Sequence, residues 1–471
     1  MIALPEMSNG ASNMIRKRTL LLVSLAVVIF LSLAFSQSSS PKRAVLLVSL
    51  DGLRPDYVTQ ADRHGLKIPH LRRLMEEGAH ASARGVLPSV TYASHTTLVT
   101  GVAPAMHGVY SNRPFDRAPK PGEIWYWFAD YIRVPTLWDA AAQAGYATGS
   151  VAWPVTVGAT SIRFNIPEYA RTRDLEDLKM VRALATPGLL SELEKSAGPY
   201  IIDVKQGLAR DWSRTRTAAA MIRSKGTRFI TVHLAATDHV QHDTGPFSRE
   251  TLATIEETDK MVGVLRDAIH TLDPGAAVCI VSDHGFARVD HMLKLDAAFV
   301  KAGLITMKSP GDTLQTSEIS DWVAMPWLAS GSAAIVLKNS KDEAARARVS
   351  EVLRALASDP NNGIAEILDR QAIAKLGGTG EADFWVTMRS GFSTSASLNG
   401  PMVAVVKTHG THGYSPANPD VNSFFLIAGQ GIRKGANLGE IDMRRIAPTV
   451  ARVLKVPLPT SEVAALDVGA R

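Results

Sequence analysis

Four short apolar runs, separated by longer amphipathic segments, limit the folds open to this chain. Runs of this length that are rich in branched and aromatic side chains are typical of strands buried on both faces. They cover residues 44–50, 228–234, 277–281 and 423–428. The segments between them include residues 135–144 and 249–272, which have the spacing of amphipathic helices. This alternation predicts an α/β fold with a central, mostly parallel sheet and helices on both of its faces.

The length of 471 residues exceeds what one hydrophobic core usually organises. Residues 286–402 differ in character from the rest, with polar loops, a strand-like run at 333–338 and a helical pattern at 341–357. We therefore predict a main domain formed by residues 43–285 and 403–460, and a smaller inserted α+β subdomain formed by residues 286–402.

The N-terminal segment has the pattern of a secretory signal peptide. Arg16-Lys17-Arg18 precedes an uncharged apolar run that ends near Phe35, and small residues follow. We predict a signal peptide over residues 1–37. The alternative is an uncleaved membrane anchor, because the run is intermediate in length between a signal and a membrane span. Both interpretations predict export, with the rest of the chain in the periplasm or outside the cell.

Charge and cysteine usage exclude several classes of protein. Part of the net charge of +6 lies in the leader, and no long basic block follows, so a nucleic-acid polymer is not an expected partner. The single cysteine, Cys279, cannot form an internal disulfide and is expected in a buried strand. The residues after it exclude the Cys-x-Pro-x-Arg motif of sulfatases. The chain also has no Gly-x-Ser-x-Gly elbow and no Gly-Lys pair, so an α/β-hydrolase and a Walker-type NTPase are not supported.

Acidic and histidine residues follow three of the predicted strands. In parallel sheets, ligands bind at the carboxyl ends of the strands. The residues at these ends are Asp51, Asp238 with His242, and Asp283 with His284. A fourth cluster is the glycine-flexed loop predicted at 408–414, which contains His409 and His412. Each cluster alone is a common loop composition, but four together predict a metal site, since zinc accepts carboxylate oxygen and imidazole nitrogen together.

Two further expectations concern the backbone and a nucleophile. Gly285 is expected to turn the chain so that Asp283 and His284 can share one metal. The Ser- and Thr-rich segment 88–101 could supply a hydroxyl nucleophile activated by a metal, at a helix N-terminus that also helps to bind phosphate. The alternative is that these hydroxyl groups only cap the helix.

Taken together, these residues resemble the nucleotide pyrophosphatase/phosphodiesterase branch of the alkaline phosphatase superfamily, the type I phosphodiesterases. The matching segments follow the order of the family and cover residues 49–55, 88–101, 104–112, 135–154, 237–246, 282–285 and 410–414. The resemblance implies an alkaline-phosphatase-like fold and a hydrolase of phosphoric ester or anhydride bonds. The implied cofactors are two divalent metal ions, most commonly Zn²⁺ in this family.

The resemblance also implies a role for each site residue. One zinc would be held by Asp238, His242 and His412. The other would be held by Asp51, Thr91, Asp283 and His284. Thr91 corresponds to the family nucleophile, and Asn112 to a residue that hydrogen-bonds a phosphoryl oxygen. Tyr92 follows the nucleophile at a position where the family has an aromatic residue that can stack on a nucleobase.

The expected substrate is a small phosphodiester or a nucleotide. This chain reads Thr91-Tyr-Ala-Ser-His95 where the family commonly reads Thr-Phe-Pro-Asn-His, which affects recognition of the leaving group. No cationic side chain can be assigned to the extra charge of a monoester, so a phosphomonoesterase or phosphonate hydrolase is the second choice. A phospholipid head-group phosphodiester is another alternative.

A binding protein that has lost its metals is disfavoured by the complete ligand set. No oligomeric state is indicated. The aromatic residues 125–128 are expected in the core rather than in a pocket.

Overall fold

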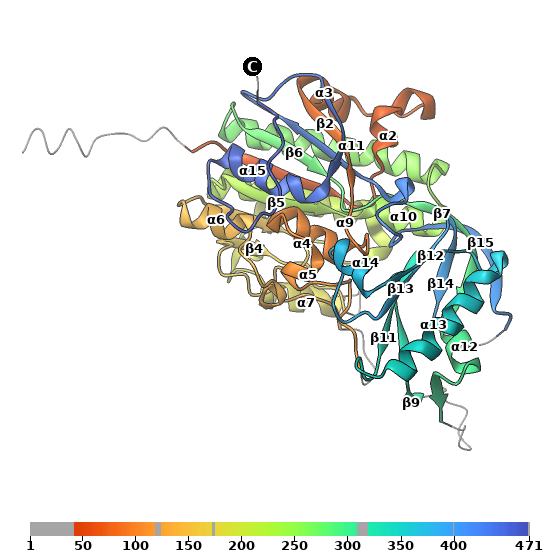
Figure 1. Ribbon diagram of the computed structural model, residues 1–471. Coiled ribbons are helices and arrows are strands. Elements are labelled where there is room, and N and C mark those ends of the chain that lie inside the picture. Colours follow the sequence, from red (N-terminus) through yellow and green to blue (C-terminus); the bar gives the residue numbers. More distant parts are fainter. Residues whose placement is uncertain (1–41, 118–123, 172–174, 309–318, 399, 470–471) are drawn as a thin grey trace, which may run out of the picture. The chain divides into compact units, whose positions relative to one another are not determined.

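A sheet of eight strands forms the centre of the fold (Figure 1). In spatial order the strands are β17 (Ala436–Asp442), β2 (Gly78–Arg84), β16 (Ser423–Ala428), β6 (Ala277–Val281), β1 (Val45–Leu50), β5 (Phe229–Leu234), β3 (Thr148–Val151) and β4 (Phe164–Ile166). β16 runs antiparallel to both of its neighbours, and the other pairs in this sheet are parallel. The predicted α/β class and mostly parallel sheet are confirmed, and each of the four apolar runs is one of its strands.

This computed structural model describes residues 42–117, 124–171, 175–308, 319–398 and 400–469. The predicted leader, residues 1–37, lies outside these ranges. Within them, no helix is both long and apolar enough to cross a membrane.

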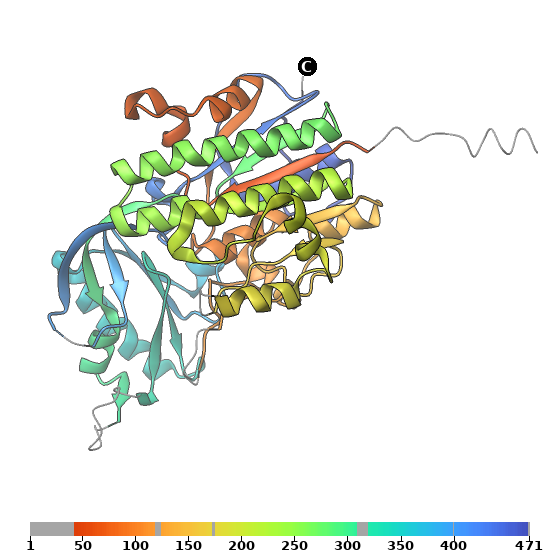
Figure 2. The same cartoon turned by 180° about the vertical axis from the view of Figure 1, so that it is seen from behind.

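Alternate side chains of β1 belong to two different hydrophobic cores. Leu46 and Val48 pack with residues of α3 (Pro69–Glu77), α8 (Leu189–Ala197), α9 (Gly207–Lys225) and α11 (Arg249–Leu272). Val45 and Leu47 pack with residues of α4 (Thr91–Thr100), α6 (Leu137–Gln143) and α15 (Ile446–Leu454). Figure 2 shows α9 and α11 on the face of the sheet opposite to the one that carries α4 and α15 in Figure 1. A strand with period-two alternation and helices on both faces has no polar side, which explains why five of the six residues of β1 are apolar.

Two of the predicted helices begin at capping residues that can be recognised in the sequence. α11 begins after Ser248, whose side chain accepts a hydrogen bond from the Thr251 N–H, and it buries Ile255, Val262 and Leu265. α6 begins at a capping box formed by Thr136 and Asp139. The remaining helices of this part are α2 (Pro55–Thr59), α5 (Pro104–His107), α7 (Leu175–Leu184) and α10 (Ala236–Thr244).

Three smaller sheets are built from residues 287–411. The first contains, in spatial order, β10 (Ala324–Leu328), β11 (Ser332–Leu337), β13 (Phe384–Met388) and β12 (Ile364–Asp369). The second contains β14 (Gly391–Ser395), β7 (Ala287–Lys294) and β15 (Val403–Thr411). The third contains β8 (Ile305–Met307) and β9 (Ile319–Trp322). The helices of this region are α12 (Leu295–Lys301), α13 (Glu343–Ser358) and α14 (Arg370–Lys375).

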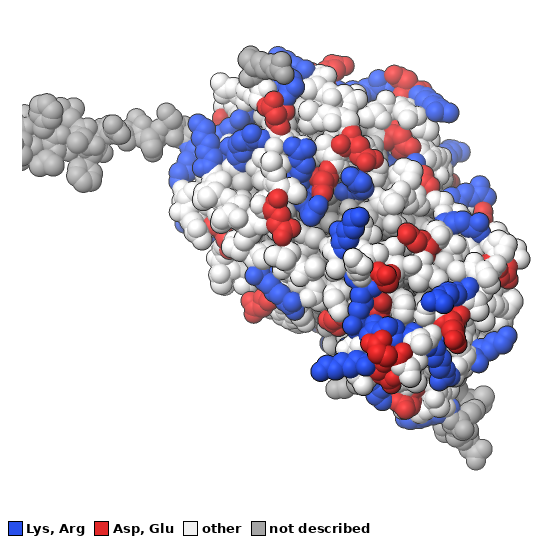
Figure 3. All heavy atoms as spheres, viewed as in Figure 1, with Lys and Arg blue, Asp and Glu red and all other residues white. Residues whose placement is uncertain are grey.

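One strand crosses the predicted domain boundary. β15 follows residue 402 but pairs with β7, which lies in the predicted subdomain. Residues 408–411 of the predicted glycine-flexed loop therefore belong to a strand. Residues from Arg43 onward form one compact unit. The division into residues 43–285 with 403–460 and an inserted 286–402 stays a prediction. On the face drawn in Figure 3, Lys and Arg side chains are intermixed with Asp and Glu side chains.

Candidate functional site

The predicted metal ligands come from four chain segments that meet at one edge of the main sheet. Asp51 follows β1, and Asp283 follows β6. Asp238 lies in the first turn of α10, which follows β5. Because β6, β1 and β5 are adjacent and parallel, their carboxyl ends lie together. His412 reaches the same edge from the end of β15.

The first candidate metal group consists of Asp238, His242 and His412. Asp238 and His242 are four residues apart on α10 and therefore share a helix face. The Asp238 Oδ1 atom lies 3.4 Å from His242 Nε2 and 3.7 Å from His412 Nε2. His409, the other histidine of the predicted loop, does not belong to this group, and its Nδ1 lies 2.9 Å from the Lys407 carbonyl oxygen.

The second candidate metal group consists of Asp51, Asp283 and His284. The His284 Nε2 atom lies 3.1 Å from Asp283 Oδ2 and 3.5 Å from Asp51 Oδ1. The Thr91 Oγ1 atom also lies 3.5 Å from His284 Nε2. The hydroxyl group of Thr91 is thus adjacent to the second group, as the resemblance implied.

The three histidines are oriented in the same way. The Nδ1 atom of His242 lies 3.2 Å from the Gly410 carbonyl oxygen, that of His284 3.1 Å from Gly285 O, and that of His412 3.2 Å from Ser89 O. A carbonyl oxygen only accepts, so each Nδ1 carries the proton and donates. Each Nε2 then faces the carboxylates. This arrangement is the usual one for histidines that bind metals.

The carboxylates of both groups keep one oxygen without a hydrogen-bond partner. These buried atoms are Asp51 Oδ1, Asp238 Oδ1 and Asp283 Oδ2. The opposite oxygen is held in two cases: Asp51 Oδ2 lies 2.9 Å from His233 Nε2, and Asp283 Oδ1 accepts from the Gly52 N–H at 3.1 Å. Atoms in tetrahedral positions about 2.0–2.1 Å from a zinc ion lie about 3.3 Å apart. The observed spacings are close to this value, so the residues fit divalent metal ions.

The electrostatics of the site indicate an excess of negative charge. Burial, together with the neighbouring carboxylates Asp283 and Asp238, raises the pKa of Asp51 well above its usual value. Burial lowers the pKa of His284, but the carboxylates of Asp283 and Asp51 outweigh it and raise this pKa to about 9. Carboxylates that disfavour each other's ionisation are stabilised when a cation lies between them.

Glycines beside the candidate ligands have distinct roles. Asp283 and His284 do belong to one group, as expected for a chain that turns before Gly285, but Gly285 itself has no positive φ. Instead, a Cβ atom at this position would lie 2.5 Å from the Asp420 carbonyl oxygen, so close packing requires glycine. The glycines with positive φ are Gly52 (71°) and Gly413 (82°), which follow Asp51 and His412.

Thr91 is the first residue of α4, as expected for a nucleophile at a helix N-terminus. The Asn112 Oδ1 atom accepts a hydrogen bond of 2.9 Å from the Tyr92 N–H. This bond fixes the side-chain amide of Asn112 beside Thr91, with its N–H₂ group still able to donate. His95 Nδ1, which lies on the same helix, donates to the Thr91 carbonyl oxygen at 2.8 Å and stabilises the first turn.

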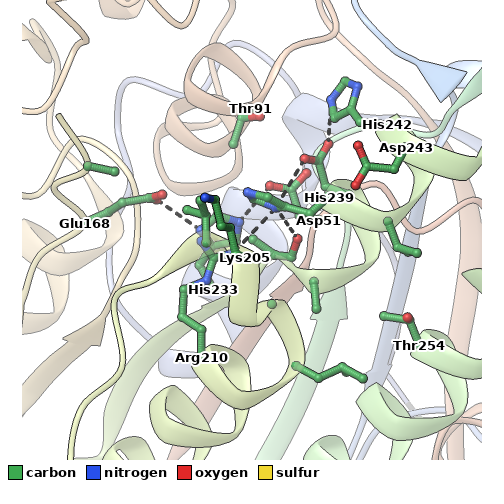
Figure 4. A pocket seen from close by; sticks show the side chains of 18 of the residues that line it. Asp51, Thr91, Glu168, Lys205, Arg210, His233, His239, His242, Asp243 and Thr254 are labelled. Carbon is green, nitrogen blue, oxygen red and sulfur yellow. Dashed lines mark hydrogen bonds and ion pairs between the residues drawn. The ribbon is translucent and has the colours of Figure 1, made fainter. Parts of the chain in front are cut away.

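A pocket of about 630 Å³ opens over both metal groups (Figure 4). Thr91, Asn112 and Tyr92 line it. The ring centroid of Tyr92 lies 5.2 Å from that of Trp125, which also lines the pocket. Of the four aromatic residues expected in the core, Tyr126 and Trp127 are buried there, Trp125 is partly buried, and Phe128 is exposed.

Further pocket residues were not identified from the sequence. His233 lies between two carboxylates, with Nε2 2.9 Å from Asp51 and Nδ1 3.1 Å from Glu168. The only signal in the sequence was a histidine inside an apolar strand. Two cationic residues, Lys205 and Arg210, also line the pocket, although no cationic group could be assigned from the sequence.

Comparison with known proteins gives consistent results. A sequence profile described as type I phosphodiesterase / nucleotide pyrophosphatase matches residues 45–415. The chain is 25% identical over 269 residues to the bis(5′-adenosyl)-triphosphatase of Bos taurus, covering 55% of this chain and 51% of that protein. It is 24% identical over 250 residues to ectonucleotide pyrophosphatase/phosphodiesterase family member 1 of Homo sapiens, covering 51% of this chain and 23% of that protein. The matched regions thus span about half or less of these relatives.

Solved structures share the fold. Human ectonucleotide pyrophosphatase/phosphodiesterase 5 superposes with a TM-score of 0.60 at 20% identity, covering 91% of this chain and 97% of that chain. An inactive threonine-to-alanine variant of the murine protein, in complex with AMP, superposes with a TM-score of 0.61 at 18% identity, covering 91% and 98%.

Proposed function

Because the chain belongs to the type I phosphodiesterase / nucleotide pyrophosphatase family, we propose that it is an exported hydrolase of phosphodiester or pyrophosphate bonds in nucleotides. The observation that supports this most directly is the position of the Thr91 hydroxyl group, 3.5 Å from His284 Nε2 at the second candidate metal group. The murine neighbour supports a nucleotide substrate and an essential threonine, because its threonine-to-alanine variant is inactive and binds AMP.

We propose that Asp238, His242 and His412 hold one zinc ion, and that Asp51, Asp283 and His284 hold a second together with Thr91. Bound there, the ions would lower the pKa of a coordinated hydroxyl group and neutralise the charge of phosphoryl oxygens. The support in this chain is the unpartnered carboxylate oxygen in each ligand Asp and the common orientation of the three histidines.

The residues of the chain provide positioning and a nucleophile. The Thr91 Oγ1 atom forms a bond to phosphorus while the bond from phosphorus to the leaving oxygen breaks, which gives a phosphothreonine. Attack by water then breaks the Thr91 Oγ1–P bond and releases phosphate ester and free Thr91. The Asn112 N–H₂ group donates to a phosphoryl oxygen and stabilises the charge that develops there. Tyr92 and Trp125 offer aromatic faces to a nucleobase.

The test is a hydrolysis screen of purified residues 38–471, with and without a chelator. The substrates are the p-nitrophenyl ester of thymidine 5′-monophosphate, p-nitrophenyl phosphate and ATP. We expect chelator-sensitive activity that is faster on the diester and on ATP than on the monoester. Faster monoester cleavage would identify a phosphomonoesterase, the second candidate, in which Lys205 and Arg210 would instead bind the extra charge of the monoester. Zinc-bound protein that is silent on all three would overturn the nucleotide assignment.

A further inference from the structure

One wall of the pocket carries two cationic side chains. Lys205 lies in the short 3₁₀ helix η3 (Val204–Gln206), and Arg210 lies near the start of α9. In Figure 4 both lie on the side of His233 and Glu168, away from His242 and Asp243. Neither side chain forms a hydrogen bond with Thr91 or Asn112 among the described residues. Thr91 and Asn112 line the same pocket as these two cations.

Arg210 is a buried cation that is incompletely hydrogen-bonded among the described residues, although the carboxylates of Asp211 and Glu168 act on its charge. Its residue is 4% exposed, and its Nε atom has no hydrogen-bond partner. The nearest carboxylate oxygen, Asp211 Oδ1, is 3.9 Å away and lies 3.7 Å from Arg214 as well. The other oxygen of Asp211 already accepts from the Ala236 N–H at 2.7 Å. A buried guanidinium with an unsatisfied N–H is costly unless an anion supplies the missing acceptor.

The other neighbour of Arg210 is a poor acceptor. Arg210 Nη2 lies 3.5 Å from His239 Nδ1, but that nitrogen is 2.8 Å from the Ala235 carbonyl oxygen and so carries a proton. His239 Nδ1 in turn lies 3.7 Å from Asp238 Oδ2. The guanidinium of Arg210 is thus one side chain away from the first candidate metal group.

Lys205 provides an accessible charge on the same wall. Its ammonium group forms no hydrogen bond or ion pair among the described residues. The carboxylate of Asp203 acts on it electrostatically, but the oxygens of Asp203 already accept from the Lys205 backbone N–H and from Gln206. Glu168, on the same side, directs its carboxylate at His233 instead.

We propose that Lys205 and Arg210 form an anion subsite that binds a further phosphate of the substrate, beyond the one attacked by Thr91. The favoured substrates are then nucleotides with two or more phosphates rather than diesters with a single one. Ammonium and guanidinium groups bind phosphate oxygens through charge-assisted hydrogen bonds. This assignment rests on the proposed function, because it takes the scissile phosphorus to lie at Thr91.

The test compares ATP with the p-nitrophenyl ester of thymidine 5′-monophosphate, which has one phosphate, for zinc-loaded wild type and variants. In Lys205→Gln and Arg210→Gln we expect kcat/KM for ATP to fall about tenfold more than kcat/KM for the diester, since a hydrogen bond to a charged group accounts for about a tenfold or larger effect. Arg210→Lys retains the charge and should lose less. Lys195→Gln, an exposed lysine of α8 outside the pocket lining, controls for a general loss of positive charge.

A direct measurement separates this proposal from the proposed function. Calorimetric binding of inorganic pyrophosphate to the zinc-loaded proteins should weaken about tenfold in Lys205→Gln and not in Lys195→Gln. Equal losses on both substrates, or unchanged pyrophosphate binding in Lys205→Gln, would overturn the subsite. If the wild type cleaves neither substrate, the proposed function fails, and pyrophosphate binding alone decides on the subsite. If Arg210→Gln does not fold, the results for Lys205→Gln alone test the subsite.

Discussion

The imidazole ring of His284 lies parallel to that of His412, with ring centroids 3.6 Å apart and planes inclined by 9°. These two histidines belong to different candidate metal groups. Their stacking brings the groups into direct contact, on the scale of the roughly 3.5–4 Å that separates the ions of two-metal sites. We therefore expect metal ions held by the two groups to act on one substrate position rather than on two separate ones.

Replacing Thr91 by Ala should remove turnover without emptying the metal site. We expect kcat to fall by about 10³-fold or more, since the nucleophile is lost while all Asp and His ligands remain. Thr91→Ser, which keeps a hydroxyl group, should retain part of the activity. Zinc content per chain and single-turnover kinetics provide the measurements. Substantial residual activity in Thr91→Ala would rule out the nucleophile assignment.

Removing the imidazole of His412 should weaken one metal selectively. We expect His412→Ala to lower the zinc content from about two ions to about one per chain, because Asp238 and His242 alone leave an incomplete set of ligands. His409→Ala is the matched control, since His409 lies in the same segment but outside both groups. Equal zinc contents in the two variants, measured by elemental analysis, would contradict the first group.

Asn112 can be tested through its two different roles. Asn112→Asp keeps an acceptor for the Tyr92 N–H but loses the N–H₂ donor, whereas Asn112→Ala loses both. We expect both variants to lose about 10²-fold in kcat, as is usual when one donor to a developing oxyanion is removed. Only Asn112→Ala should also be destabilised, by about 1 kcal/mol. Wild-type kcat in either variant would exclude Asn112 as a donor to phosphate.

His233 should act through Asp51. It lies 2.9 Å from Asp51 Oδ2 and fixes the orientation of that carboxylate. His233→Phe should reduce zinc affinity or kcat/KM by about 10–100-fold, and His233→Gln, which can still donate to Asp51, by less. Zinc titration with a competing chelator distinguishes this role from a loss of folding. Identical zinc affinity in His233→Phe and wild type would show that Asp51 does not need this partner.

The buried carboxyl group of Asp296, remote from the candidate metal ligands in sequence, predicts a pH dependence of stability. Burial raises the pKa of Asp296 to about 6, and its Oδ1 atom has no hydrogen-bond partner. The folded state therefore holds this proton to higher pH than the unfolded state, and the contribution of Asp296 to stability falls as the pH rises from about 4 to about 6. Asp296→Asn should be more stable than wild type at pH 7.5 by up to about 3 kcal/mol, with a much smaller difference at pH 4. Urea unfolding at both pH values checks this, and a pH-independent difference would contradict it.

The sequence by itself determined four adjacent strands of the main sheet and the acidic and histidine residues that follow three of them. A strand covered by helices on both faces is apolar at most positions, so β1, β5, β6 and β16 can be recognised in the sequence as short, mainly apolar runs. The acidic and histidine residues at the carboxyl ends of such strands can also be recognised in the sequence, because they stand where each apolar run ends and the chain leaves the core. The order of the motifs then carried the family resemblance, which the sequence profile over residues 45–415 confirms.

Only the tertiary structure decided which side chains face the pocket. His409 and His412 are three residues apart in one glycine-rich segment, but the pairing of β15 with β7 ends at Thr411 and brings only His412 to the site. His233 appears in the sequence as one polar residue in a buried strand, and its role depends on Asp51 and Glu168, which are 182 and 65 residues away along the chain. Lys205 and Arg210 face the pocket because of how η3 and the start of α9 pack, and local sequence patterns carry no information about contacts formed over such distances.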